Sequence, residues 1–542
     1  MNLLQEHFDI AVETPDGIGK LRKLILTLAM QGKLVPQDPN DQPASELLKE
    51  IEAEKKRLVK EGKIKEQKQL PPIKEEEIPY VLPGNWEWIR ISDSYYSIGA
   101  KNNQLQTKDY KQSGSFPIID QGKTFIAGYS DDSEKILRVG APVVIFGDHT
   151  KNIKYVDFDF IIGADGVKVL KPYTSILSKF FYFVIRSYVI PHRGYARHFG
   201  LLNENLLPVP PHAEQKRIVA KIDQLMSLCD KLEAQRNERD RKRLTVHASA
   251  VSGLLNAPDK PAFNRSWSFI TRHFSELYSV TENVAELKKA ILQLAVMGKL
   301  VQQDPNDQPA SELLEDIESE KKRLVKEGKI KEQKPLPPIK EEDMPYRLPR
   351  GWEWVRLAHI GEVNPRNSFQ DEKLAGFVPM TLISADYGVP PTFETRKWHE
   401  IKKGYTHFAD GDAAVAKITP CFENGKACVF QGLPNGIGAG TTELHVFRNT
   451  FGRVFPPYLL SYLKNPMYVK RGISKMTGSA GQKRVPAEYF SLNPFPLPPL
   501  AEQKRIVAKI DQLMALCDKL DARLSSASAK RTAILDAVLA RV

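Results

Sequence analysis

Cysteine is scarce in this sequence, with four residues in 542, which excludes a disulfide framework. Cys229 and Cys517 hold matched places in a repeat, whereas Cys421 and Cys428 lack the close spacing of a zinc ligand pair. We therefore expect reduced thiols, no metal site and a cytoplasmic location. No run of about 18 apolar residues is present, and the first residues carry acids where a signal peptide needs a basic start, so we expect no membrane insertion.

Catalytic motifs are also missing, beginning with the GxxxxGK[ST] phosphate loop that ATP hydrolysis needs. Residues 436–440 (GIGAG) imitate a dinucleotide-binding loop, but no βαβ pattern surrounds them, and we expect a surface loop. Residues 465–468 (NPMY) resemble the NPPY loop of adenine methyltransferases, yet the third residue is Met and no companion cofactor loop follows. We predict that the chain has no catalytic residues and binds no cofactor.

The most distinctive feature that is present is a repeated helix. Residues 214–232 (EQKRIVAKIDQLMSLCDKL) return at 502–520 with one change, Ser227 to Ala515. Apolar residues follow the 3.5-residue spacing of a helix that buries a narrow seam against another helix. The predicted seam residues are Ile218, Ile222, Leu225, Cys229 and Leu232 in the first copy, and Ile506, Ile510, Leu513, Cys517 and Leu520 in the second. We predict that the two seams pack on each other as long antiparallel coiled-coil helices.

A second repeat precedes each of these helices. Residues 32–80 match residues 298–346 at 42 of 49 positions, at a constant offset of 266. Each copy predicts an amphipathic helix that Gly32 or Gly298 ends, a charged helix over 46–61 or its copy, and an extended arm. The arms lead to NWEW at 85–88 and GWEW at 351–354.

The segments between the repeats differ from each other, although their borders are nearly identical. Apolar runs at 141–146, 158–163, 167–170 and 413–418 predict strands, and FFYFVIRSYV and PPYLLSYL predict one helix each. We predict an α+β protein with two globular domains in a tandem pseudo-twofold repeat. The predicted parts are a helical region and arm (1–89), a first globular domain (90–207), a spacer helix (208–256), a second helical region and arm (257–355), a second globular domain (356–495) and a second spacer helix (496–542).

Positive charge gathers in these two inserts. The chain carries +12 at pH 7, of which residues 91–205 hold +3 and residues 357–491 hold +5. A Gly-rich basic run lies near the end of each insert, with Arg197 17 residues before Glu214 and Arg484 18 residues before Glu502. Glycine lets the backbone approach phosphate, while Arg can bind guanine and Gln adenine with two hydrogen bonds. The candidate DNA-binding residues are Lys123, Lys151, Arg193, Tyr195, Arg197, His198, Arg366, Lys417, Lys475, Ser479, Gln482, Lys483 and Arg484.

With these motifs the sequence resembles the specificity subunits of type I restriction-modification systems. The resemblance rests on residues 32–48 (GKLVPQDPNDQPASELL) and their copy, the NWEW and GWEW entries, and the proline-rich AEQKRIVAKID entries from Pro208 and Pro496. It implies a non-catalytic subunit that reads a split site in double-stranded DNA and docks two modification subunits together with restriction subunits. Methylation with S-adenosylmethionine and ATP-driven cleavage would belong to those partners.

Two other interpretations stay open at this point. The chain could be a protein-interaction scaffold without DNA specificity, or a methyltransferase that uses residues 465–468. Salt-dependent binding of duplex DNA separates the first interpretation from DNA recognition. Methyl transfer by the purified chain would support the second.

Overall fold

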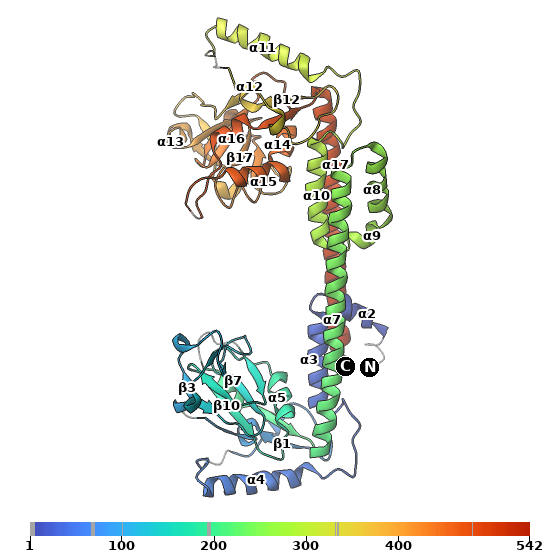
Figure 1. The fold of residues 1–542 in the computed structure, drawn as a ribbon, viewed down its shortest axis with the longest axis vertical. Coiled ribbons are helices and arrows are strands. Elements are labelled where there is room, and N and C mark those ends of the chain that lie inside the picture. The colour runs from blue at the N-terminus through green and yellow to red at the C-terminus, as the bar shows by residue number, and fades with distance from the viewer. Residues whose placement is uncertain are drawn as a thin grey trace. The chain divides into compact units, whose positions relative to one another are not determined.

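We describe the protein from a computed structural model, which covers residues 6–66, 71–99, 101–191, 197–330, 332, 335–479 and 481–541. The chain divides into two compact units: unit 1 holds Met1–Glu238 and Ser528–Val542, and unit 2 holds Arg239–Ala527. Both boundaries fall inside the two longest helices, α7 (His212–Leu255) and α17 (Leu500–Leu539) (Figure 1). Each unit therefore contains part of both long helices, as well as β-sheets of its own. The predicted α+β class with two tandem domains and long helices is confirmed.

Both units repeat the same short helices of the frame, by which we mean everything outside the inserts 91–205 and 357–493. These helices are α2 (Phe8–Glu13), α3 (Gly17–Met30) and α4 (Ala44–Lys60) in unit 1, and α9 (Phe274–Leu277), α10 (Thr281–Val296) and α11 (Ala310–Lys326) in unit 2. As predicted, Gly32 and Gly298 follow α3 and α10 with positive φ, +69° and +65°. A Cβ at Gly32 would lie 2.5 Å from Cγ of Pro83, so the arm packs where only glycine fits.

The two copies of the seam are buried within their own units, which corrects the prediction that they pack on each other. In unit 1, Cys229 and Leu232 lie with Leu21 of α3 and with Leu535 near the end of α17. Ile218 and Ile222 belong to the next cluster of the same unit, and Leu225 is half-buried. Heptad spacing shows that a helix buries a narrow face but does not identify the helix that covers it.

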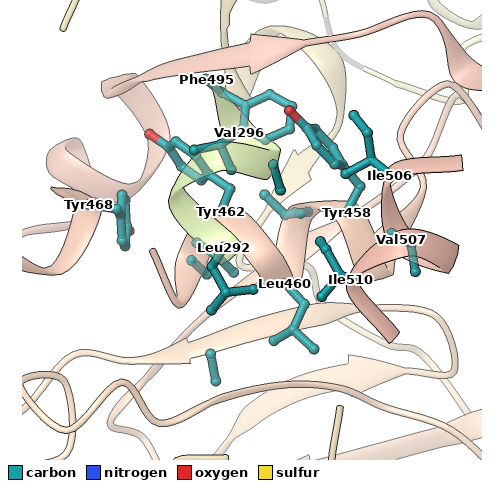
Figure 2. Packing of buried hydrophobic residues seen from close by; sticks show 14 of the residues in the cluster. Leu292, Val296, Tyr458, Leu460, Tyr462, Tyr468, Phe495, Ile506, Val507 and Ile510 are labelled. Carbon is teal, nitrogen blue, oxygen red and sulfur yellow. The ribbon is translucent and has the colours of Figure 1, made fainter. Parts of the chain in front are cut away.

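In unit 2 the second seam lies in the largest core of that unit. Figure 2 shows Leu292 and Val296 of α10 together with Tyr462 and Ile510. The seam residues there are Ile506, Ile510, Leu513, Cys517 and Leu520, and Leu254 near the end of α7 belongs to the same cluster. In each unit, then, a short frame helix packs with the first part of one long helix and the last part of the other.

A helix that the sequence did not predict follows α7. The predicted spacer helix ends at residue 256, and α8 (Lys260–Arg272) begins only four residues later. Asp259 is its N-cap, since the carboxylate accepts a hydrogen bond from the N–H of Ala262 at 2.7 Å. Pro261 stands in the first turn, where a missing N–H costs nothing. The NAPDKP sequence is therefore a break followed directly by a helix start.

The two inserts share one topology despite their different sequences. In the first insert, one sheet has the order β2-β10-β7-β8 and the other β3-β9-β4-β5, with β6 also paired to β9. In the second insert the orders are β13-β20-β17-β18 and β15-β14-β19-β16. In both, the second sheet contains a matching parallel pair, β4 with β9 or β14 with β19. The first insert adds β3, which also pairs parallel with β9 and has no counterpart among the described strands of the second insert.

The strands of the first insert are β2 (Tyr95–Ser97), β3 (Gln104–Leu105), β4 (Phe116–Ile119), β5 (Gly128–Ser130), β6 (Ile136–Leu137), β7 (Val143–Gly147), β8 (Ile153–Val156), β9 (Phe160–Gly163) and β10 (Val167–Pro172). Those of the second are β13 (Glu362–Val363), β14 (Leu374–Val378), β15 (Glu394–Lys397), β16 (Thr406–Ala409), β17 (Ala413–Ala416), β18 (Ala427–Val429), β19 (Ile437–Gly440) and β20 (Leu444–Arg448). The insert helices are α5 (Ser178–Ser187) and α6 (Phe199–Asn203), then α12 (Leu357–Ile360), α13 (Trp398–Ile401), α14 (Pro456–Leu463), α15 (Pro466–Lys475) and α16 (Ala487–Leu492).

The central strand of each insert is buried on both faces, which explains its continuous apolar sequence. In β7, Val143 and Ile145 face the second sheet, while Val144 and Phe146 face the helices and the frame. In β17 the alanines 414 and 416 face the second sheet in the same alternating manner. A strand of this kind needs small or branched apolar residues at every position, but their identity can vary.

Each insert begins and ends on one pair of strands of the frame. β1 (Glu87–Arg90) pairs antiparallel with β11 (Leu206–Val209), and β12 (Glu353–Arg356) pairs in the same register with β21 (Pro494–Leu497). The insert is therefore a closed loop of chain that leaves and rejoins the frame at adjacent residues.

A buried carboxylate at the start of each long helix ties the frame together. Glu214 is fully buried and accepts hydrogen bonds from Nε1 of Trp86 at 2.9 Å and from Nε2 of Gln37 at 2.7 Å. In unit 2, Glu502 accepts the same bonds from Trp352 and Gln303, both at 3.0 Å. Burial raises the pKa of both glutamates, and these hydrogen bonds partly oppose that rise. The duplicated sequence thus builds the same buried junction twice.

Trp86→Phe should destabilise unit 1 in a pH-dependent way. A raised folded-state pKa means that the Glu214 carboxyl favours folding below its unfolded pKa, about 4.3, and opposes folding as the pH rises through the folded value. Loss of the indole N–H leaves the charged carboxylate short of a donor. We expect a loss of about 1–3 kcal/mol in the free energy of unfolding at pH 7.5 and a smaller loss at pH 5.

Urea unfolding of the full chain at both pH values measures this difference. Trp88→Phe is the matched control, because the Trp88 ring packs 5.1 Å from the Tyr80 ring and its nitrogen bonds to no carboxylate among the described residues. Equal losses at the two pH values for Trp86→Phe would show that the bond to Glu214 does not matter.

The two segments that resemble catalytic motifs, residues 465–468 and 436–440, have structural roles. Asn465 is the N-cap of α15, accepting from the N–H of Met467 at 2.8 Å, and it is buried against Leu292 of α10. Residues 437–440 form β19, an inner strand in which Ala439 is fully buried, so the expectation of a surface loop was wrong. Glycines in this strand allow close approach: a Cβ at Gly440 would lie 2.1 Å from the carbonyl oxygen of Val378.

Candidate nucleic-acid interface

At one end of the first insert, three loops join through backbone hydrogen bonds. The N–H of Asp148, directly after β7, donates to the carbonyl of Gly166, directly before β10, at 2.8 Å. The N–H of His198, at the end of the first basic run, donates to the carbonyl of Asp148 at 2.8 Å. We call this group the first loop cluster: residues 120–127, 148–152, 164–166 and 197–198.

The second insert forms the same pattern. The N–H of Lys417, directly after β17, donates to the carbonyl of Glu443, directly before β20, at 2.9 Å. The N–H of Val485, at the end of the second basic run, donates to the carbonyl of Lys417 at 2.8 Å. The second loop cluster consists of residues 379–393, 417–426, 441–443, 476–479 and 481–485. Arg197 and Arg484 each precede the residue that closes this pattern, so they hold equivalent places.

Side chains from neighbouring strands fix the first cluster. Gln121 donates to the carbonyl of Asp165 at 2.8 Å and accepts from the N–H of His149 at 3.2 Å. Lys154 is buried on β8, and its ammonium group donates to the carbonyl of Thr124 at 2.6 Å. Burial lowers the pKa of Lys154, and the nearby carboxylate of Asp120 opposes that shift. Lys154 thus holds the loop that carries Lys123.

Two lysines fix the second cluster in the same manner. Lys426, beside β18, donates to the carbonyl of Met380 at 3.0 Å. Lys464, at the end of α14, is buried and donates to the carbonyls of Ser384, Ala385 and Gly425 at 2.9 to 3.2 Å. Burial lowers the pKa of Lys464 to about 8.

The second cluster contains a small hairpin, whose described residues are 477–479 and 481–484. Thr477 and Arg484 pair through two backbone hydrogen bonds, of 3.0 and 2.8 Å, and Gln482 donates to Ser479 at 3.0 Å across the turn. The hairpin pairs with residues 417–419, because Thr419 donates to the carbonyl of Lys483 at 3.0 Å. Its residues Ser479, Gln482 and Lys483 are exposed.

Most of the candidate DNA-binding residues that the structure describes fall in these two clusters. Lys123 and Arg197 are exposed in the first cluster, and Lys151 is half-buried there with its ammonium group 3.1 Å from the carbonyl of Ile190. In the second cluster Lys417 is half-buried, and exposed Lys475 ends α15 beside it. Arg193 and Tyr195 lie outside the described residues.

Two candidates are placed differently from the prediction. The side chain of His198 is fully buried, and its Nδ1 lies 3.0 Å from the carbonyl oxygen of Asp148, so His198 cannot contact DNA in this conformation. Arg366 donates to the carbonyl of Tyr405 at 3.1 Å and lies outside the loop cluster. A histidine in a basic run suggests a contact residue. Here the backbone bond to Asp148 fixes His198 as the N-cap of α6, and its side chain is buried.

Sequence reasoning missed the residues that hold the clusters. Gln121, Glu443 and Thr419 carry no motif, and each is separated by at least 40 residues from some of the chain that it binds. The only sequence signal is that each one lies within three residues of the end of an apolar strand. Among the described residues, no group of three or more metal-ligating side chains is present.

The search for membrane spans also has a negative result. In the part of the chain that the structure describes, none of the helices has both the length and the apolar content needed to cross a bilayer.

Two basic inserts of one topology, each on a copy of the same helical frame, define a tandem recognition protein. A family model described as the type I restriction modification DNA specificity domain matches residues 83–239 and 349–527, together more than half of the chain. The chain belongs to this family.

Individual relatives match part of the chain. It is 57% identical over 239 residues to the type I restriction enzyme EcoAI specificity subunit of Escherichia coli, covering 44% of this chain and 41% of that protein. It is 54% identical over 239 residues to the EcoEI specificity subunit of Escherichia coli, covering 44% and 40%. The match thus spans about two fifths of the length of each relative.

Solved structures match over a larger part of the chain at low identity. One, from work on assembly and conformational transition of the type I R-M system, is 18% identical with a TM-score of 0.47 and covers 85% of this chain and 98% of that chain. The HsdS subunit from Thermoanaerobacter tengcongensis is 20% identical with a TM-score of 0.37, at the same coverage.

Proposed function

We propose that this chain is the DNA-recognition subunit of a type I restriction-modification complex. Each insert reads one half of a split site in double-stranded DNA through its loop cluster. The observation that carries this proposal is the identical backbone pattern of the two clusters, on which different basic side chains are displayed. A constant scaffold with variable polar loops suits a protein that reads different bases with one architecture.

The proposal assigns the chemistry to partner subunits. The chain docks modification subunits, which methylate adenine, and restriction subunits, which cleave DNA, and it works in the cytoplasm where that DNA lies. Two copies of the modification subunit fit the duplicated frame. Phe8 and Phe274, 266 residues apart, are exposed by 41% and 43%, so each copy presents the same apolar residue to a partner.

Binding of the purified full chain to a randomised duplex library tests the proposal. We expect selection of two short sequences separated by unread base pairs, with affinity that falls steeply as salt rises, because neutralised phosphates release counterions. A protein-interaction scaffold would show neither selection nor a specific complex. The mass of the complex with modification subunits tests the stoichiometry of two.

Arg197→Ala should relax the first half-site only. Arg197 is exposed, and within the described residues its side chain has no ion pair or hydrogen bond, so its guanidinium is available to a base or a phosphate. A bidentate contact to guanine contributes roughly 1–3 kcal/mol of discrimination. Selection by the variant from the same library measures this loss. Uniform weakening of all sequences would instead assign Arg197 to a phosphate.

A further inference from the structure

The two equivalent arginines, Arg197 and Arg484, have different surroundings. Arg484 uses every nitrogen of its guanidinium within the protein. Nε lies 2.9 Å from Oε2 of Glu443, Nη2 lies 2.8 Å from Oε1 of the same carboxylate, and Nη1 lies 3.3 Å from the carbonyl oxygen of Gln482. This two-bonded ion pair lowers the pKa of Glu443, chiefly through its hydrogen bonds with Arg484. The exposed fraction is 45% for the Arg484 side chain and 21% for that of Glu443.

The first insert cannot form this pair. The place of Glu443 is taken there by Gly166, which has a φ of +88°. A Cβ at Gly166 would lie 2.8 Å from Cδ2 of His149 and 2.9 Å from Nε2 of Gln121, so no side chain fits. The Gln121 amide fills the space that a carboxylate would need, and within the described residues no carboxylate binds Arg197.

The Arg484 pair closes the base of the hairpin. Arg484 pairs by its backbone with Thr477 and forms a bridge to Ile418, while its side chain binds Glu443 at the start of β20. Three separate parts of the second insert, residues 417–419, Glu443 and the hairpin, therefore meet at one residue, through its backbone and its side chain. Exposed Gln482 and Lys483 stand next to it on the hairpin.

We infer that Arg484 and Glu443 are positioning residues for the second half-site, whereas Arg197 contacts DNA itself at the first. The ion pair holds the hairpin so that Gln482 and Lys483 meet the bases and the backbone of the DNA. A forked Arg–carboxylate pair suits this role, since its planar geometry fixes orientation as well as distance. It also neutralises Glu443, which would otherwise repel phosphate. This inference rests on the proposed function and divides its contact residues between the two halves.

Replacing Glu443 separates the two possible roles of Arg484, because the expected effects have opposite signs. If the pair positions the hairpin, Glu443→Gln loosens it and discrimination at the second half-site falls. Alternatively, Arg484 reads a base and Glu443 merely competes for its guanidinium group. In that case Glu443→Gln releases Arg484, and discrimination at the second half-site is kept or rises. Total affinity does not decide the matter, because removal of a negative charge strengthens contact with any DNA. The measured quantity is therefore the ratio of affinities for duplexes altered in one half only.

The experiment compares Glu443→Gln, Arg484→Ala, Arg484→Lys and the double variant Glu443→Gln with Arg484→Ala, in the full chain, on a randomised duplex library and then on single duplexes. We expect each single variant to cut discrimination at the second half about tenfold, within the range of a lost base contact, and the double variant to lose no more. Lysine should not restore it, because an ammonium group cannot form the two-bonded pair.

The first half-site is the internal control for folding, and it should be unchanged in all four variants. Glu394→Gln is the matched control for loss of an exposed ion pair, since Glu394 binds Arg396 on β15. Unchanged or improved discrimination in Glu443→Gln, with a loss in Arg484→Ala, would overturn the inference and make Arg484 a base reader. No loss in either variant would overturn it as well. A wild-type chain that selects no sequence at either half overturns the proposed function itself, which no variant of Glu443 or Arg484 can do.

Discussion

A chain whose first insert, residues 91–205, is replaced by its own second insert, residues 357–493, should read the same half-site twice. The frame holds the two inserts through matching contacts. Gln215 accepts from the N–H of Leu177 and donates to the carbonyl of Ser175, at 2.8 and 3.1 Å, whereas Gln503 binds the N–H of Phe455 and the carbonyl of Arg453, at 2.6 and 3.2 Å. All four partners are backbone groups, so these four contacts do not depend on the side chains of the insert.

The strands that border the two inserts pair in the same register, so the two inserts can be exchanged at equivalent residues. Arg90 faces Leu206 and Arg356 faces Pro494, so both cuts fall directly inside the strand pair. The transplanted Arg453, which binds Asp316 at 3.1 Å in unit 2, would meet Glu50 at the matching place of α4. Both copies of the frame thus have a carboxylate at this position. In the native chain, Glu50 accepts a hydrogen bond from the hydroxyl group of Ser175. The two copies of the frame are therefore compatible with either insert.

Selection from a randomised duplex library, or maps of methylated adenines in cells, would show the outcome. We expect the first half-site to disappear completely, the second to appear twice, and the gap between the halves to stay unchanged. The exchange of residues 357–493 by the first insert is the reciprocal control. A chimaera that retains the original first half-site would show that the frame, rather than the insert, reads the DNA.

A second large effect is expected from lengthening the long helices. α7 passes from unit 1 to unit 2 between Glu238 and Arg239, and α17 passes back between Ala527 and Ser528. An insertion directly after Leu232 would disturb unit 1, because Leu232 packs near Leu535 and Arg236 donates to the carbonyls of Val12 and Thr14. Four residues added at each of the two boundaries fall between the units and not inside either of them.

These insertions should widen the unread gap and leave both half-sites as they are. Four residues add about 6 Å of helix, close to two base-pair steps of the duplex. An insertion of four residues also changes the phase of a packed helix less than one of three, by about 40° instead of about 60°. We expect a gap that is longer by one or two base pairs, which methylation maps in cells carrying the variant would reveal. Insertion of four residues in α7 alone is the control, since it shifts one helix against the other and should reduce activity. An unchanged gap with full activity would mean that these helices do not measure the DNA.

The sequence predicted the elements whose signals are local. Helix ends at Gly32 and Gly298, the long helices and the apolar strands such as β7 depend on periodicity and on residues with restricted backbone angles, which a single sequence displays. Internal repetition added the frame, because 42 matched positions of 49 require two copies of one structure. The basic runs and the equivalence of Arg197 and Arg484 were also visible, since both arginines stand at nearly the same distance from the repeated helix.

The candidate site was predicted less completely, because its geometry depends on contacts between distant residues. The burial of His198 follows from a bond to Asp148, 50 residues earlier, and the pairing of Arg484 follows from Glu443, 41 residues earlier. No local pattern marks such partners. For the same reason the sequence could not show that two inserts with little similarity have one topology: many apolar residues suit a strand buried on both faces.

The sequence alone determined that this protein consists of a duplicated helical frame with two different basic inserts, because repetition, periodicity and charge are properties of residue order. The tertiary structure decided which helix covers each seam, since a heptad pattern defines a buried face without naming its neighbour. It also decided that α3 and α10, rather than the opposite seam, cover those faces. Finally, it gave two equivalent arginines different surroundings, because Glu443 leaves room for an ion pair where Gly166 and Gln121 leave none.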